Sequence, residues 1–188
     1  MIDAEERRRL ERSLASLEES LHRFATVTHR KSRWRIAATL FNKGATLVRL
    51  ERFGEGLEVC GEVVRRFGDA SDAPTQLLVA EALRYRRIAL RNQHRREEEV
   101  EACDEVLRRF GEPADPALRD EVAGALLEKG VALAGLGRVP EAVAAYDEVL
   151  RRFGAGGPDG LGGRDATPLQ AEIVEAARAR RNEAVTDR

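Results

Sequence analysis

Apolar residues recur along this chain every three or four positions, which is the spacing of one face of an α-helix. The pattern is clearest between residues 116 and 153, where two helical runs flank Gly135-Leu136-Gly137-Arg138, a turn whose glycines accommodate positive φ angles. Pro140 suits the first turn of the second run, because a residue there needs no N–H donor. No window alternates apolar and polar residues with period two. The pattern therefore predicts an all-α protein built from helical hairpins.

The helical pattern repeats every 43 residues. The tetrapeptide Arg-Arg-Phe-Gly begins at Arg65, Arg108 and Arg151, and Phe24 lies one further step before Phe67. Apolar positions keep the same step: Leu40, Leu83 and Leu126, and Leu47, Leu90 and Leu133. A period between about 20 and 50 residues is typical of solenoids, in which each unit buries its apolar face against its neighbours.

This step divides the chain into segments. Residues 1–29 are expected to form an N-terminal capping helix, because their apolar positions match the second helix of a unit, although the spacing also fits a short coiled-coil seam. Residues 30–153 hold three repeats, at 30–72, 73–115 and 116–153. The glycine-rich residues 154–167 are expected to be a linker, and residues 168–188 a C-terminal capping helix and tail. About eight helices are predicted.

The third unit resembles the tetratricopeptide repeat (TPR). The residues that carry the resemblance are Gly130, Ala132, Leu133, Gly137, Val139, Glu141, Ala142, Val143, Tyr146, Val149 and Leu150. Leu126 replaces the usual tryptophan, and the period exceeds the common one of about 34. The chain is thus similar to the longer TPR-like arrays of bacteria with an Arg-Arg-Phe-Gly linker. The resemblance implies a right-handed TPR-like solenoid of helical hairpins, a scaffold or adaptor that binds a protein or peptide on the concave face made by the first helices.

Small residues mark the expected crossing of the two helices in a hairpin. The pairs are Gly44 with Gly56 and Gly130 with Ala142, each 12 residues apart. The second unit carries Arg87 and Glu99 at these positions. We interpret this pair as an inter-helix salt bridge that reaches solvent; the alternative is a slipped helix register.

Charge is distributed unevenly, although the formal net charge is only −1. The first helices of units one and two are basic, and the second helix of unit two is acidic. With first helices on the concave face, that face is expected to bind an acidic peptide through arginine–carboxylate pairs. The predicted peptide-binding residues are Phe41, Arg49, Arg84, Tyr85, Arg91 and Asn92, with Val48, Ile88, Leu127 and Val131 beside them.

Phe41 and Tyr85 are expected to hold an apolar side chain of the partner between them. Three alternatives stay open: arginines that only solvate the helices, a helical repeat that binds nucleic acid, and an oligomerising or structural segment of a larger regulator that associates through its exposed helix ends. Trp34 is expected to cover the joint with the N-terminal helix, with a ligand contact as the alternative.

No residue pattern indicates an enzyme, a metal site or a cofactor. His22, His29 and His94 lie at unrelated repeat positions and lack metal-ligand spacing. Cys60 and Cys103 share a repeat position with Tyr146 and are expected to be core residues. With no signal-peptide pattern and no long apolar run, a cytoplasmic protein without membrane contact is expected.

Overall fold

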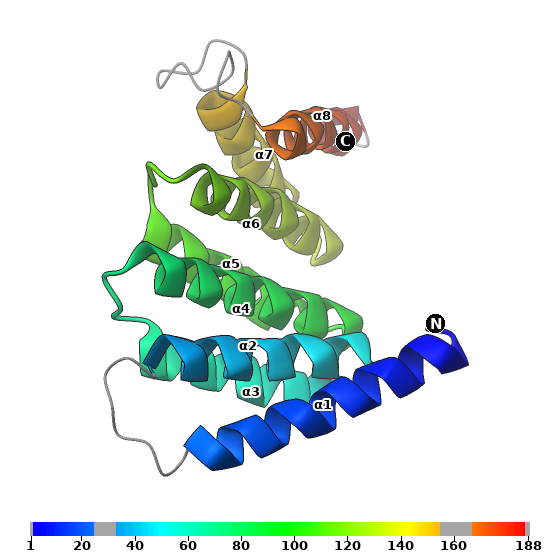
Figure 1. Ribbon diagram of the computed structural model, residues 1–188. Helices are drawn as coiled ribbons and strands as arrows, with labels where there is room; N and C mark the ends of the chain where they lie inside the picture. Colours follow the sequence, from blue (N-terminus) through cyan, green and yellow to red (C-terminus); the bar gives the residue numbers. More distant parts are fainter. Residues whose placement is uncertain (1, 25–32, 155–166, 187–188) are drawn as a thin grey trace. The chain divides into compact units, whose positions relative to one another are not determined.

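The structure is a computed structural model that describes residues 2–24, 33–154 and 167–186. These residues form eight α-helices and no strand, which confirms the all-α prediction and the helix count for the described part of the chain. The helices are α1 (Ala4–Phe24), α2 (Arg33–Arg49), α3 (Phe53–Phe67), α4 (Ala73–Asn92), α5 (Arg96–Phe110), α6 (Pro116–Gly135), α7 (Val139–Phe153) and α8 (Pro168–Thr186) (Figure 1). The predicted linker lies outside the described residues except at its two ends.

The chain forms two compact units, Met1–His94 and Arg95–Arg188, so their boundary falls inside the second predicted repeat. In the first unit α2 packs against α1, α3 and α4, and α3 packs against α4. In the second unit α6 packs against α5, α7 and α8, and α7 packs against α8. Within the first unit, α2 and α4 lie side by side, and α1 crosses α2 at an angle (Figure 1).

Helix bounds follow the 43-residue step of the sequence. The helices α3, α5 and α7 are each 15 residues long and end at Phe67, Phe110 and Phe153. The helices α4 and α6 are each 20 residues long. Each begins after an aspartate cap followed by a proline in the first turn: Oδ1 of Asp72 accepts the Thr75 N–H at 3.0 Å, and Oδ1 of Asp115 accepts the Ala117 N–H at 2.8 Å.

The turns before α3, α5 and α7 share one backbone feature. The residue two positions before each helix has a positive φ angle, 62° at Glu51, 59° at His94 and 74° at Gly137. The sequence identifies only the glycine, since glutamate and histidine rarely adopt this conformation. An arginine follows in each turn and forms a bidentate ion pair with a glutamate three residues later: Arg52 with Glu55, Arg95 with Glu98, and Arg138 with Glu141.

The small residues predicted at the helix crossings lie where two helices meet most closely. A Cβ added to Gly44 would lie 2.5 Å from Sγ of Cys60, and one added to Gly56 would lie 2.6 Å from Cγ2 of Val48. In the compact unit Arg95–Arg188, a Cβ on Gly130 would overlap the ring of Tyr146. Val48 therefore faces α3, which corrects the prediction that it lines the peptide-binding face.

Arg87 and Glu99 are both buried, each with 1% of its surface exposed. Arg87 belongs to the compact unit Met1–His94 and Glu99 to the compact unit Arg95–Arg188, so the salt bridge between them stays a prediction. The expectation that the pair reaches solvent is wrong, because both side chains are buried. A buried charge is strongly destabilising unless it is paired, so burial makes a partner necessary for each of these two side chains.

The first helix buries Leu10 and Leu14 against Leu47 and Leu50 of the α2 end. This apolar contact holds α1 as a layer on α2. Among the described residues, no helix combines the length and the apolar character needed to span a bilayer.

Candidate functional site

Three of the predicted peptide-binding residues meet on the face formed by α2 and α4. The rings of Phe41 and Tyr85 are in edge-to-face contact, with centroids 5.7 Å apart and an interplanar angle of 69°. The guanidinium of Arg84 lies over the Tyr85 ring, 5.0 Å from its centroid. All three side chains are half-buried. The two rings contact each other directly, so they leave no space for a partner's side chain. This corrects the prediction that they hold such a side chain between them.

The other predicted residues lie apart from this cluster and are engaged within the chain. Arg49 projects toward α1, where its Nη2 lies 2.8 Å from Oε1 of Glu6. The Asn92 amide donates to the Ile88 carbonyl of its own helix at 2.8 Å. Arg84 and Arg91 both have interaction partners within the chain. The predicted set is therefore divided into a cluster of three residues on the α2–α4 face and three polar residues with partners of their own.

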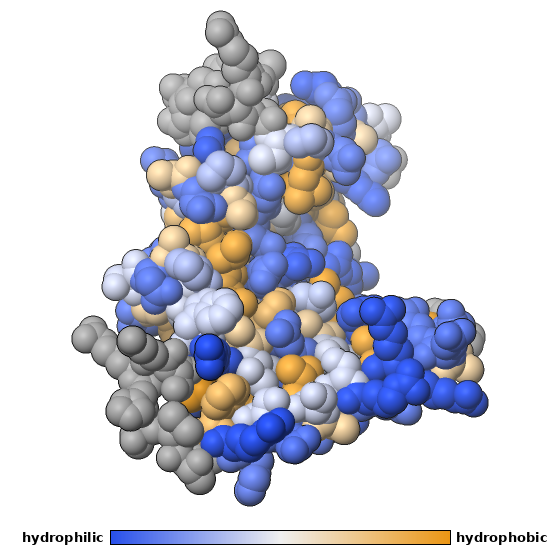
Figure 2. Space-filling model, viewed as in Figure 1, coloured by the Kyte–Doolittle hydropathy of each residue, from blue (hydrophilic) through white to orange (hydrophobic). Residues whose placement is uncertain are grey.

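Acidic residues of α1 neutralise part of the basic helix α2. Nζ of Lys43 lies 2.9 Å from Oε1 of Glu18, and Arg49 pairs with Glu6 in the same way. The sequence shows α2 as basic because these carboxylates come from another helix, too far away along the chain to be recognised as partners. Figure 2 shows that hydrophilic side chains cover the N-terminal part of α1.

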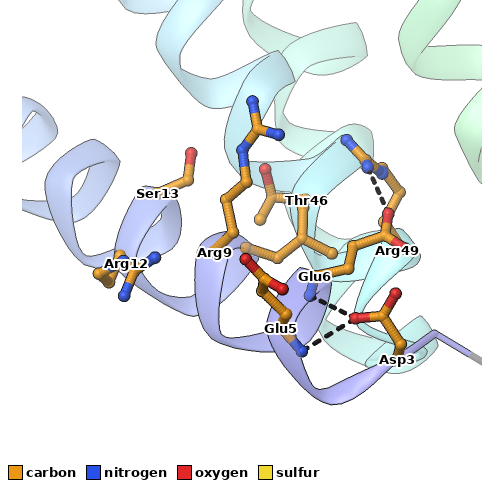
Figure 3. Close-up of a pocket in the computed structure, with 9 residues that line it drawn as sticks. Asp3, Glu5, Glu6, Arg9, Arg12, Ser13, Thr46 and Arg49 are labelled. Carbon is orange, nitrogen blue, oxygen red and sulfur yellow. Dashed lines mark hydrogen bonds and ion pairs between the residues drawn. The ribbon is translucent and has the colours of Figure 1, made fainter.

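A hollow of about 540 Å³ opens between the N-terminal half of α1 and the end of α2 (Figure 3). Arg9, Arg12 and Ser13 line it from α1, and Thr46 and Arg49 line it from α2. The sequence pattern gave no sign of this hollow, because it depends on the angle at which α1 crosses α2.

Three carboxylates also line this hollow, and two of them are already engaged. Oδ1 of Asp3 caps α1 by accepting the N–H groups of Glu5 and Glu6 at 2.9 and 2.8 Å. The Glu6 carboxylate pairs with Arg49. Figure 3 shows both interactions at one end of the hollow. Glu5 is exposed there as a third negative charge.

Trp34 is exposed over 49% of its surface among the described residues. It lines a second hollow, of about 370 Å³, with Asp69 and Asp72 of the connection between α3 and α4. The neighbouring Arg33 is directed to α3, since its Nη2 donates to the Arg66 carbonyl at 3.2 Å. The joint with the N-terminal helix lies outside the described residues, so the expectation that Trp34 covers it stays a prediction.

Cys60 and Cys103 are buried, as predicted from their repeat position, and neither forms a disulfide. Burial raises the pKa of the Cys60 thiol to about 12, so this sulfur is protonated at neutral pH. In the described part of the chain, no group of three or more His, Cys, Asp or Glu side chains is arranged to hold a metal ion. No protein-family model matches the chain, and no curated protein or solved structure matches it.

Proposed function

We propose that this chain is a TPR-like repeat protein, a right-handed solenoid of helical hairpins. Three observations support the proposal. Helix bounds recur at the 43-residue step, with long and short helices in alternation from α3 to α7. Small residues occupy the close crossings of α2 with α3 and of α6 with α7. Alternate helices also touch, α2 with α4 and α6 with α8, as stacked hairpins require.

We further propose that the protein is a non-enzymatic scaffold that binds an acidic peptide segment of another protein on the α2–α4 face. The observation that carries this proposal is the cluster of Phe41, Tyr85 and Arg84, which joins two neighbouring helices at the surface. Aromatic and arginine side chains dominate the binding energy of protein interfaces, because they bury large areas and still make directed polar contacts. Two cysteines that form no disulfide fit a reducing compartment, so the proposal includes a cytoplasmic location.

An acidic partner is favoured because helix α2 already binds carboxylates from within the chain. Glu6 and Glu18 of α1 pair with Arg49 and Lys43 at less than 3 Å. The Arg84 guanidinium lies over the Tyr85 ring and 3.9 Å from the Glu81 carboxylate, so it already pairs with a carboxylate while stacked on a ring. A peptide with an apolar residue next to a glutamate or aspartate would match this cluster.

Capture from a cell lysate tests this proposal when the variant Tyr85→Ala/Arg84→Gln is compared with the parent protein. The matched control is Arg65→Gln, which removes the same charge from an exposed position of α3. We expect a protein to be retained by the parent and by the control and lost from the double variant, at salt concentrations where weak charge attraction is screened.

Each result has one interpretation. If the captured material is lost after nuclease treatment and binding depends steeply on salt, the ligand is nucleic acid and not a peptide. Equal capture by all three proteins would contradict a binding role for the α2–α4 face. Circular dichroism of the double variant, with unchanged helicity, is the required folding control.

A further inference from the structure

We propose that the hollow between α1 and α2 is a binding site for a phosphate monoester group, held by the side chains of Arg9, Ser13, Thr46 and Arg49. The site is separate from the cluster on the α2–α4 face, and it does not depend on the proposed function. The chemistry that the site recognises is the phosphate dianion, whether it is esterified to a side chain or is inorganic phosphate.

The α1 wall of the hollow presents donors that no other described residue uses. Arg9 and Ser13 are four residues apart, so they project from the same face of α1. Neither side chain has a hydrogen bond or ion pair with another described residue, and the same holds for Arg12. Arginine supplies five N–H donors in a planar fork and serine one O–H donor, and both groups suit phosphate oxygens.

The α2 wall contributes the hydroxyl of Thr46. Thr46 is only 8% exposed, yet its hydroxyl has no hydrogen-bond partner among the described residues. It lines the hollow, and Figure 3 shows its hydroxyl turned toward the side where Arg9 and Ser13 lie. The side chain is mostly buried but its oxygen stays open to solvent, so a phosphate oxygen can accept its hydrogen bond in place of water.

The number and directions of the donors favour phosphate over carboxylate. Donors reach the hollow from α1 through Arg9 and Ser13, and from α2 through Thr46 and Arg49. A carboxylate has two oxygens in one plane and fits one guanidinium edge. A phosphate monoester has three terminal oxygens and a charge near −2 at neutral pH, so it can accept from both walls at once.

The carboxylates of the hollow set the expected strength of binding. Asp3 is occupied as a helix cap and Glu6 as the partner of Arg49. Glu5 is left as an exposed negative charge that repels an anion. Removing this charge with Glu5→Gln should therefore tighten binding, which is the opposite of the effect of removing an arginine.

The experiment is a titration of the ¹⁵N-labelled protein with O-phospho-L-serine in a low-salt buffer without phosphate. Inorganic phosphate, L-serine and L-glutamate are titrated in parallel. We expect the NMR signals of Ser13, Thr46 and the Arg9 side chain to shift with O-phospho-L-serine and inorganic phosphate, and to stay in place with serine. Stronger binding of O-phospho-L-serine than of inorganic phosphate would identify a phosphorylated side chain as the ligand, and equal binding would identify the phosphate group alone.

Variants assign the binding to the hollow. Arg9→Gln should weaken it about tenfold or more, because a hydrogen bond between charged groups is lost. The matched control Arg8→Gln removes the same charge from an exposed position of α1 that does not line the hollow, and should leave binding nearly unchanged. Thr46→Val should weaken binding about threefold or more without unfolding the protein, since its hydroxyl has no partner to lose. Glu5→Gln should strengthen binding about twofold or more.

Several outcomes would overturn the proposal. Equal shifts with L-glutamate would show that the site does not distinguish phosphate from carboxylate. Equal losses in Arg9→Gln and Arg8→Gln would show a general attraction to α1. An absence of shifts at Ser13 and Thr46 up to about 20 mM phosphoserine would rule out the site, since even a millimolar dissociation constant would then saturate it.

Discussion

Gly44 of α2 and Cys60 of α3 lie so close together that a Cβ on the glycine would stand 2.5 Å from the cysteine Sγ and 3.3 Å from its backbone nitrogen. The same two repeat positions hold Gly130 and Tyr146 in the second unit, also in close contact. Each crossing thus depends on a glycine in one helix and on whatever side chain the other helix places above it.

Gly44→Ala should destabilise the protein by about 1–3 kcal/mol, because the added methyl group overpacks the crossing. Gly124→Ala is the control, since a Cβ there meets no atom within 4 Å and helix propensity should add about 0.5–1 kcal/mol of stability. Urea unfolding followed by circular dichroism measures both. The double variant Gly44→Ala/Cys60→Ala should recover part of the loss; a loss as large as that of Gly44→Ala alone would show that the sulfur is not the obstacle.

His94→Gly should stabilise the first unit by up to about 1 kcal/mol, because histidine at a φ of 59° is strained and glycine is not. Gly137→Ala at the equivalent turn should cost about 1 kcal/mol, since its φ is 74°. Thermal unfolding compares these variants with Glu58→Gly, an exposed helical position of α3 where glycine should destabilise. A gain at position 58 as large as at position 94 would mean that backbone strain is not the cause.

Asp120→Ala should loosen the start of α8. The Oδ1 atom of Asp120 accepts hydrogen bonds from Oγ1 of Thr167 and Nε2 of Gln170, both at 2.7 Å, and Gln170 is only 1% exposed. Leaving this amide buried without a partner should cost about 1–3 kcal/mol. Hydrogen exchange should then be fastest in α8, whereas Asp120→Asn, which keeps an acceptor oxygen, should lose less. Equally faster hydrogen exchange in all helices from α5 to α8 would contradict a local role for Asp120 at the start of α8.

The cap at Asp72 should make stability depend on pH in the acid range. Hydrogen bonds from the Thr75 side chain and backbone lower the pKa of this carboxyl below its usual value of 3.8. A lowered pKa means that the contribution is present above the unfolded pKa and is lost as pH falls through the folded one. Asp72→Asn should therefore be less stable than the parent at pH 6, and the difference should shrink below about pH 3.8. A difference that stays constant from pH 6 to pH 2.5 would exclude this titration.

Cys60 should be unreactive toward thiol reagents in the folded protein at pH 8, because burial holds its pKa near 12 and blocks access. Labelling with a disulfide reagent should proceed at the rate of opening and should become fast in about 6 M guanidinium chloride. Rapid labelling of Cys60 without denaturant would show that the α2–α3 crossing is open in solution.

The sequence by itself determined the helices and their ends, because these depend on residues a few positions apart. Apolar spacing marks the helices, aspartate followed by proline starts α4 and α6, and Arg-Arg-Phe-Gly marks the ends of α3, α5 and α7. The glycines at close crossings were also predictable, since their positions recur with the 43-residue step.

Only the tertiary structure decided which side chains meet between helices. The crossing angle of α1 brings Glu6 to Arg49 and Glu18 to Lys43, and it turns Arg49 away from the predicted cluster. The same angle opens the hollow beside Thr46, whereas the packing of α2 on α3 buries Val48. The physical reason is that helix formation is governed by local hydrogen bonds and propensities, but contacts between helices depend on packing angles that residues far apart in the chain set together.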